Sequence, residues 1–219
     1  MIRFVLIVVL ILGISFFGVI GFSNMQDNTP DLDQQVRKFL EDRRGTWRAL
    51  NVPEADGKAL HDIIIQHGYK SALEIGTSNG YSGIWIAWAL AKTGGKLITV
   101  EIDKYRHDEA VANFRAAGLS KYIDARLGNA HTIVPALDGP FDFVFCDADK
   151  EWYINYLKAV LPKLTGGGCF AAHNVSEPSG WRMGEGLDYL EYARSVPSLE
   201  TKILDIPGTG GLAVSYKIP

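Results

Sequence analysis

The sequence predicts an α/β fold in which helices cover both faces of a mostly parallel, doubly wound sheet. Short apolar segments alternate with segments of helical periodicity along most of the 219 residues. These short segments are almost uniformly apolar, which is typical of strands that are buried on both faces. A content of 47% apolar and 21% charged residues indicates one globular domain with a sizeable core.

Each element follows from its local pattern. Apolar residues at helical spacing predict one or two amphipathic helices between residues 32 and 50, and then a helix that ends at Gly68. We expect strands at 71–76, 96–103, 123–128, 141–149 and 167–174, and helices at 81–92, 105–118, 130–137, 152–164 and 186–194. Two final strands, 199–206 and 211–218, flank the turn PGTGG, break the alternation and predict one antiparallel strand pair.

The N-terminal segment differs from the rest of the chain. Residues 4–22 carry no charge, and about 20 apolar residues suffice to cross a bilayer. We expect residues 1–23 to form a single-pass membrane anchor, 24–30 a linker and 31–219 the main domain. Arg3 before the apolar stretch and the acidic residues after it predict that this domain lies on the non-cytoplasmic side. A cleaved signal peptide, which would leave an exported or secreted protein, is the alternative.

Charge and cysteine content restrict the partners. The formal net charge of −3 argues against nucleic acid, which calls for a basic domain. Cys146 and Cys169 lie in apolar segments, so we expect buried, unreactive thiols. The oligomeric state stays open, with a homodimer as one candidate.

Ligands of open α/β sheets bind outside the carboxyl ends of the strands. The first of these ends reads EIGTSNGYSG, and its glycines let the backbone turn tightly and approach a ligand. Their spacing differs from the G-x-G-x-x-G of dinucleotide binders, which disfavours NAD. The second strand ends at Glu101, an acidic residue suited to two ribose hydroxyls. Together these features predict a nucleoside site.

Polar residues also follow the fourth and fifth predicted strands. Asp147, Asp149 and Lys150 come after one strand, and His173 and Asn174 end the next. Carboxylate, imidazole and amide at neighbouring strand ends are able to converge on one metal ion. A structural interpretation stays open, in which Asp149 caps the following helix and Lys150 is a solvated charge.

These segments resemble the catechol O-methyltransferase-like family of S-adenosylmethionine-dependent O-methyltransferases. The resemblance extends from about Asn51 to Lys217 and is carried by NVPEADGKALHDII, LEIGTSNGYSG, ITVEID, GNA, FDFVFCDADKEWYINYL and HNV. It implies a Rossmann-like, seven-stranded sheet whose last strand is antiparallel. It also implies methyl transfer to a hydroxyl of a small catechol-like or phenolic acceptor.

The resemblance assigns roles to individual residues. It implies a cofactor site formed by Val52, Glu74, Gly76, Ser82, Glu101, Ile102, Asn129, Ala130 and Asp147. It implies that Asp147, His173 and Asn174 are metal ligands, with His173 in place of an aspartate of the family, and that Lys150 is the catalytic base. Glu200 is similar to a carboxylate that steadies the second hydroxyl of a catechol. Apart from the resemblance, Trp181 and Trp152 are candidates to stack on an aromatic substrate.

His173 leaves the metal open. Magnesium prefers oxygen ligands, whereas imidazole suits softer metals. The site therefore holds a softer metal, binds magnesium or manganese more weakly, or uses no metal, with His173 as the general base. The alternative to an enzyme is an inactive, membrane-tethered module that binds S-adenosylmethionine or a partner.

Overall fold

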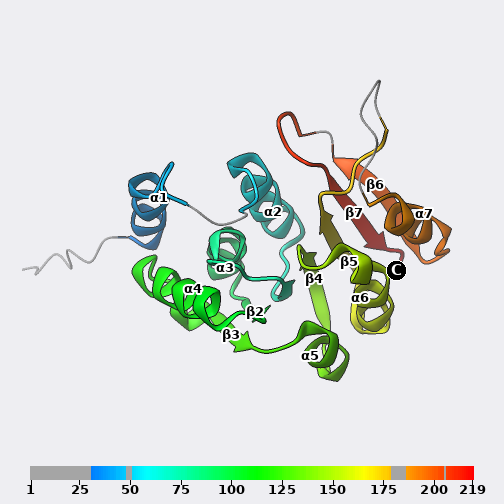
Figure 1. Ribbon diagram of the computed structural model, residues 1–219, viewed down its shortest axis with the longest axis horizontal. Helices are drawn as coiled ribbons and strands as arrows, with labels where there is room; N and C mark the ends of the chain where they lie inside the picture. Colours follow the sequence, from blue (N-terminus) through cyan, green and yellow to red (C-terminus); the bar gives the residue numbers. More distant parts are fainter. Residues whose placement is uncertain (1–30, 48–50, 179–185, 205) are drawn as a thin grey trace, which may run out of the picture. The chain divides into compact units, whose positions relative to one another are not determined.

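The computed structural model describes residues 31–47, 51–178, 186–204 and 206–219, and these form a seven-stranded sheet. The strands lie in the order β3-β2-β1-β4-β5-β7-β6 (Figure 1). β7 is antiparallel to both of its neighbours, and the other pairs are parallel. The strand bounds are β1 Ser71–Ile75, β2 Lys96–Glu101, β3 Ile123–Leu127, β4 Phe141–Cys146, β5 Leu164–His173, β6 Leu199–Leu204 and β7 Leu212–Lys217. The predicted fold class is confirmed.

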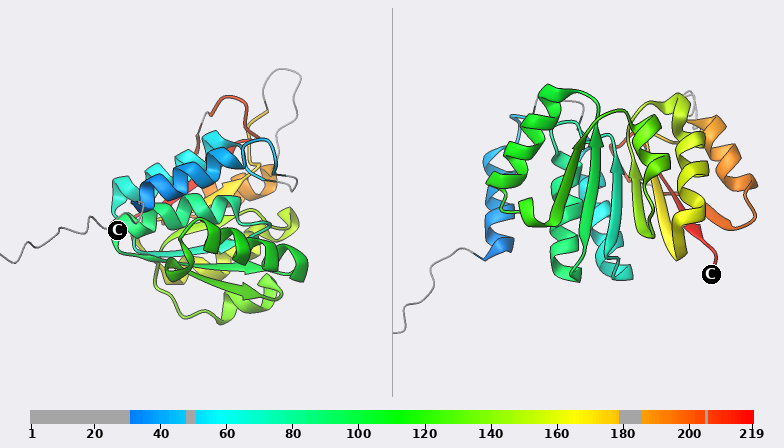
Figure 2. Two further views of the ribbon diagram at one scale, coloured as in Figure 1. Left: turned by 90° about the vertical axis from the view of Figure 1, so that its left-hand side faces the viewer. Right: turned by 90° about the horizontal axis from the view of Figure 1, so that it is seen from below.

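Helices cover both faces of the sheet (Figure 2). The helix bounds are α1 Leu32–Asp42, α2 Glu54–His67, α3 Tyr81–Thr93, α4 Lys104–Ala116, α5 Ala130–Ala136, α6 Tyr153–Val160 and α7 Leu187–Ser195. Buried side chains of α1 to α4 join one apolar core, and those of α5 to α7 join another. Alternation along β4 feeds both cores, because Phe143 and Phe145 face the first while Val144 and Cys146 face the second.

The structure refines several of the predicted boundaries. Residues 43–46 form a turn after α1, and residues 48–50 lie outside the described part of the chain. The helix expected at 152–164 is shorter, because 3-10 turns precede and follow α6. Pro162 lies in the second of these turns and has no backbone N–H to continue the helix. Gly68 ends α2 as predicted, in the left-handed conformation with φ 66°.

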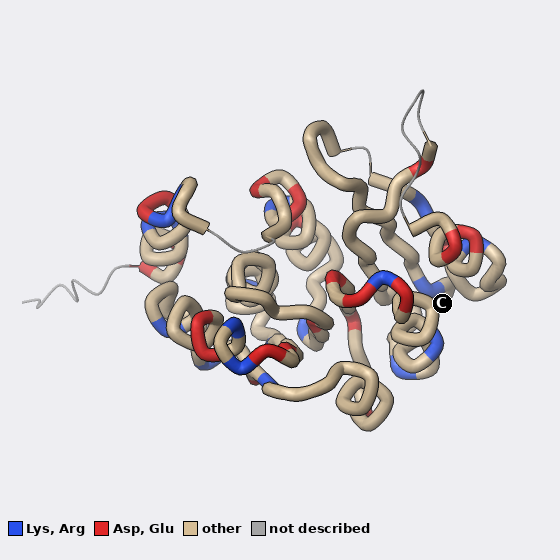
Figure 3. Tube along the Cα trace, viewed as in Figure 1, with Lys and Arg blue, Asp and Glu red and all other residues tan. Residues whose placement is uncertain are grey.

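Opposite charges are interspersed on the outer helices (Figure 3). Lys38 pairs with Asp42 on α1, and Lys104 pairs with Asp108 on α4, each one helical turn apart. Both cysteines are free and buried, as expected.

The expected membrane localisation is corrected. Within the described residues, no helix has both the length and the apolar character that a bilayer span requires. The expected anchor or signal peptide at residues 1–23, and the linker at 24–30, lie outside the described part of the chain.

Candidate active site

A cavity of about 800 Å³ lies at the carboxyl ends of β1, β2, β4 and β5. The chain continues from β1 toward β2 on one side and from β4 toward β5 on the other, so this is the point at which the strand order reverses. Most of the residues predicted to bind cofactor or to act in catalysis line it: Val52, Gly76, Ser82, Glu101, Ile102, Asn129, Ala130, Asp147, Lys150, His173 and Asn174. The fold therefore brings together residues from six separate sequence motifs.

The turn after β1 passes close to the end of β4. Gly76 has φ 94°, and a Cβ atom there would overlap the backbone carbonyl of Asp147. Gly80 has φ 88° and begins α3, where a Cβ atom would overlap the ring of Phe114. Glycine is thus required at both positions for conformation and for space. Gly76 in particular lets the turn approach the end of β4 at the edge of the cavity.

Glu74 lies outside the set of residues that line the cavity. Its carboxylate is fully buried and accepts hydrogen bonds from the hydroxyls of Ser82 and Thr99, each at 2.6 Å. Burial raises the pKa of Glu74 to about 7, although the two hydrogen bonds act in the opposite direction. Ser82 itself lines the cavity, so Glu74 supports the cavity wall through this contact.

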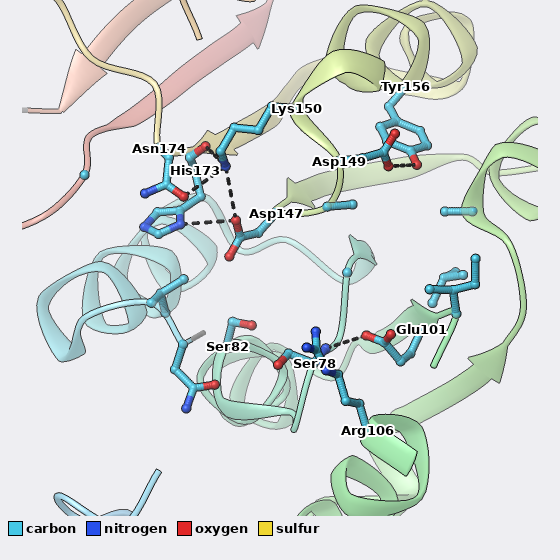
Figure 4. A pocket seen from close by; sticks show the side chains of 18 of the residues that line it. Ser78, Ser82, Glu101, Arg106, Asp147, Asp149, Lys150, Tyr156, His173 and Asn174 are labelled. Atoms are coloured by element: carbon cyan, nitrogen blue, oxygen red, sulfur yellow. Dashed lines mark hydrogen bonds and ion pairs between the residues drawn. The ribbon is translucent and has the colours of Figure 1, made fainter. Parts of the chain in front are cut away.

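Glu101 is 6% exposed at the end of β2 and fixes the backbone around the cavity. One of its carboxylate oxygens accepts the N–H of Ser78 at 2.7 Å, and the other accepts the N–H of Asp103 at 2.9 Å. Each carboxylate oxygen retains a further lone pair. Arg106 of α4 lines the same part of the cavity and was not singled out from the sequence (Figure 4).

An aromatic cluster forms the rim near Asn129 and Ala130, and of its three rings only Trp152 was singled out from the sequence. His131 stacks on Trp152 with ring centroids 3.6 Å apart. The Nε2 atom of His131 lies 2.9 Å from Asp149, and the hydroxyl of Tyr156 donates to the same carboxylate at 2.8 Å. Asp149 makes no side-chain capping bond to the following turn, so the capping interpretation was wrong. The i, i+4 spacing of Trp152 and Tyr156 was the available signal, because it places two aromatic rings on one helical face.

On the opposite side of the cavity, Lys150 and Asn174 lie together (Figure 4). The ammonium group of Lys150 donates to the side-chain oxygen of Asn174 at 2.9 Å and to the hydroxyl of Tyr153 at 3.1 Å. It also lies 3.7 Å from a carboxylate oxygen of Asp147. Asn174 follows β5 with φ 52°, a conformation that asparagine tolerates better than most residues.

His173 lies between two carboxylates. Its Nε2 atom is 3.0 Å from Asp56, which is fully buried on α2, and its Nδ1 atom is 3.3 Å from Asp147. The second contact has the distance of an ion pair but not the angle of a hydrogen bond. Burial alone would lower the pKa of His173, but the interactions with Asp147 and Asp56 outweigh it and raise this pKa to about 9.

This donor set does not fit the predicted metal. Both ring nitrogens of His173 face carboxylates, and the amide oxygen of Asn174 accepts from Lys150. Within the described residues, no group of three or more His, Cys, Asp or Glu side chains is arranged to hold a metal ion. The prediction of a metal-binding protein is corrected accordingly.

One predicted substrate residue, Glu200, is not brought to this cavity. Glu200 lies on β6 and lines a different hollow, together with Asp62 of α2 and Tyr216 of β7. Trp181 lies outside the described residues.

The sheet order and the strand-end cavity define the class of protein, a Rossmann-like domain with a cavity at its switch point. The chain belongs to the O-methyltransferase family, whose family model matches residues 24–179. The resemblance found in the sequence is thereby confirmed.

Individual relatives agree with the family. The chain is 40% identical over 131 residues to a catechol O-methyltransferase of Niastella koreensis. The aligned residues make up 58% of this chain and 59% of the relative. The match thus spans about three fifths of that relative's length. Among solved structures, O-methyltransferase TomG of Streptomyces achromogenes, involved in tomaymycin synthesis and in complex with S-adenosylmethionine, has a TM-score of 0.72 and 26% identity over 85% of this chain and 91% of that chain. An O-methyltransferase of Bacillus cereus in complex with S-adenosylhomocysteine has a TM-score of 0.72 and 26% identity, and covers 87% of this chain and 94% of that chain.

Proposed function

We propose that this protein transfers a methyl group from S-adenosylmethionine to a hydroxyl of a small catechol-like or phenolic acceptor. The observation that carries the proposal is that a single cavity is lined by Ser78 and Glu101 on one side and by Lys150 and Asn174 on the other (Figure 4). A nucleoside and a hydroxyl acceptor then lie side by side at one strand-end edge. The relatives named as catechol O-methyltransferase and as complexes with S-adenosylmethionine or S-adenosylhomocysteine support the same chemistry.

The cofactor half of the site would hold the nucleoside by backbone and carboxylate. Glu101 faces the cavity with lone pairs free for the two ribose hydroxyls. Gly76 allows the nucleoside to approach the backbone, and Asn129 and Ala130 would border the adenine. The carboxylate of Asp147 lies between this half and Lys150 (Figure 4), where it would face the positive sulfonium end of the cofactor.

The acceptor half would orient one hydroxyl for attack on the methyl carbon. In the reaction the acceptor oxygen forms a bond to this carbon, the carbon–sulfur bond breaks and its electron pair stays on sulfur as S-adenosylhomocysteine. Lys150 would take up the hydroxyl proton on Nζ, after its resting ammonium group has released a proton to solvent. Positioning of the two reactants is the main task of the protein, and good orientation contributes up to roughly 7–11 kcal/mol.

A binding module without activity is the competing function, and a two-stage experiment separates the two. Calorimetry of the full chain with S-adenosylmethionine should give saturable one-to-one binding. A panel of catechols and phenols with methyl-labelled cofactor should then yield labelled methyl ethers. Cofactor binding without methyl transfer to any hydroxyl would favour the inactive binding module over the enzyme. Absence of cofactor binding would contradict both the methyltransferase and a module that binds S-adenosylmethionine.

Lys150→Met tests the catalytic role, with Lys158→Met as a matched control on the exposed face of α6. We expect Lys150→Met to lower kcat about 100-fold, in the range of general acid–base contributions, while cofactor affinity changes little. Lys158→Met should retain the kcat of the native chain. Equal kcat values in the two variants would remove Lys150 from the mechanism.

A further inference from the structure

Asp56 is a buried carboxylate that the cofactor and acceptor roles do not use. It lies in the first turn of α2, is fully buried, and its Oδ2 atom is 3.0 Å from Nε2 of His173. Its other oxygen, Oδ1, is buried with no hydrogen-bond partner among the described residues. Burial of an ionised carboxylate is costly unless it is paired with a cation. His173 is the side chain that supplies this pairing.

The same imidazole faces a second carboxylate across the ring. Nδ1 of His173 lies 3.3 Å from Asp147, which lines the cavity next to Lys150. A metal ligand must offer a nitrogen lone pair to the ion. Here Nε2 is hydrogen-bonded to Asp56 and Nδ1 lies at ion-pair distance from Asp147, so both nitrogens face carboxylate oxygens rather than an open position for a metal.

From this geometry we infer that Asp56 and Asp147 hold His173 as a built-in cation in place of a divalent metal, and that the transferase works without one. Asp56 is a positioning residue in this arrangement, because it acts on the acceptor side of the site only through His173. The inference rests on the proposed methyl transfer for its catalytic part, whereas its metal-binding part is independent of turnover.

The charges of the cluster balance without a metal. Asp56 and Asp147 supply two negative charges, and His173 and Lys150 supply two positive charges. A divalent ion would add two further positive charges beside two cations, at a place where His173 is 5% exposed. It would also have to displace Lys150 from Asn174. The cluster therefore disfavours a divalent ion for two reasons. Its cations would repel the ion, and the side-chain oxygen of Asn174 already accepts a hydrogen bond from Lys150.

The first test measures metal binding and requires no activity. The full chain, saturated with S-adenosylhomocysteine, is titrated in a calorimeter with magnesium chloride and with manganese chloride to millimolar concentration. We expect no saturable binding for the native chain. His173→Asp, which restores an all-oxygen donor set, should bind magnesium at one site. Saturable one-to-one binding of either ion by the native chain would overturn the inference.

The second test uses turnover. The native rate should stay within about twofold when a chelator replaces magnesium, whereas His173→Asp should gain at least about tenfold on addition of magnesium. A native rate that collapses with chelator and returns with magnesium overturns the inference but leaves methyl transfer intact. Absence of turnover in every condition overturns the proposed function instead, and the calorimetric result still decides the metal question.

A third measurement isolates Asp56. Asp56→Asn keeps the size of the side chain but removes its charge, and Asp62→Asn on the exposed side of the same helix is the matched control. We expect Asp56→Asn to lower kcat by about 10-fold to 100-fold, because His173 loses its anchor, with the affinity for S-adenosylmethionine unchanged. Imidazole nitrogen NMR should show His173 protonated on both nitrogens in the native chain at neutral pH. An unchanged His173 spectrum and kcat in Asp56→Asn would overturn the positioning role.

Discussion

Glu101 shows how one side chain both builds and lines a site. Its two carboxylate oxygens hold the N–H groups of Ser78 and Asp103, which lie on the two loops that border the cavity. The loops are thereby fixed before any ligand arrives. Lone pairs that remain on the same oxygens are available to a ribose, so the residue needs no rearrangement to bind.

Glu101→Ala should weaken binding of S-adenosylmethionine by about 100-fold or more. The reason is the loss of hydrogen bonds to a charged acceptor, each worth about 1.5–3 kcal/mol. Isothermal titration calorimetry measures the change. Glu41→Ala on the exposed surface of α1 is the control and should leave the affinity as it is. Equal affinities for the Glu101→Ala variant and the native chain would remove the ribose assignment.

At the scale of elements, the β1–α3 turn couples the cofactor side of the cavity to the end of β4. Gly76 and Gly94 both have left-handed backbones, with φ 94° and 78°. They differ in surroundings, because a Cβ atom at Gly76 would overlap Asp147, whereas nothing lies within 4 Å of one at Gly94. Comparing alanine substitutions at Gly76 and Gly94 therefore separates the cost of the left-handed backbone from the cost of steric overlap.

Gly94→Ala should lower the free energy of unfolding by about 1–2 kcal/mol, the cost of the left-handed conformation alone. Gly76→Ala should cost more and should also reduce cofactor affinity, since Asp147 must move. Urea denaturation gives the stabilities and calorimetry the affinities. Similar stability losses, with cofactor binding retained in both variants, would contradict the crowding at Gly76.

At the scale of the whole molecule, Glu74 makes stability depend on pH. It lies in the centre of the sheet, where it joins β1 to Ser82 of α3 and Thr99 of β2. Its pKa is raised from the ordinary value of 4.5 to about 7 by burial. Between these values the unfolded chain loses the proton while the folded chain retains it. The contribution of Glu74 is therefore complete below about pH 4.5 and declines as the pH rises toward 7.

Glu74→Gln should remove this decline, because an amide does not titrate in this range. A shift of this size corresponds to about 3 kcal/mol of unfolding free energy between acidic and mildly basic pH. Urea denaturation at a series of pH values from 4.5 to 8 gives the free energy of unfolding as a function of pH. Over this range it should fall by about 3 kcal/mol less in Glu74→Gln than in the native chain. Parallel curves would mean that Glu74 ionises in the folded chain at its ordinary pKa.

Local patterns were sufficient to predict most of the fold. The apolar strands and the glycine at the end of α2 follow from composition and from backbone preference, which act over a few residues. The edge strand β3, partly exposed along its length, was recognisable in the same way. Exact ends were less predictable, since α6 is limited by 3-10 turns that depend on Pro162 and on packing.

The site was predictable only in part, and the reason is sequence distance. Strand ends such as Glu101, Asp147 and His173 could be placed at one edge because parallel strands align their carboxyl ends. Asp56 and His173 are 117 positions apart, and no periodicity connects a helix to the strand on which it packs. The same limit applies to Glu200, whose strand β6 carries it to another hollow.

The sequence by itself determined the order of strands and helices, the glycine turn and the polar residues at the strand ends, because each depends on neighbours along the chain. Only the tertiary structure decided what those residues are for. It buried Asp56 against His173 and turned both imidazole nitrogens toward carboxylates. It also placed the ammonium group of Lys150 where it donates a hydrogen bond to the side-chain oxygen of Asn174. These contacts depend on which charged side chains are buried next to one another, and that is established only when the helices and strands pack together.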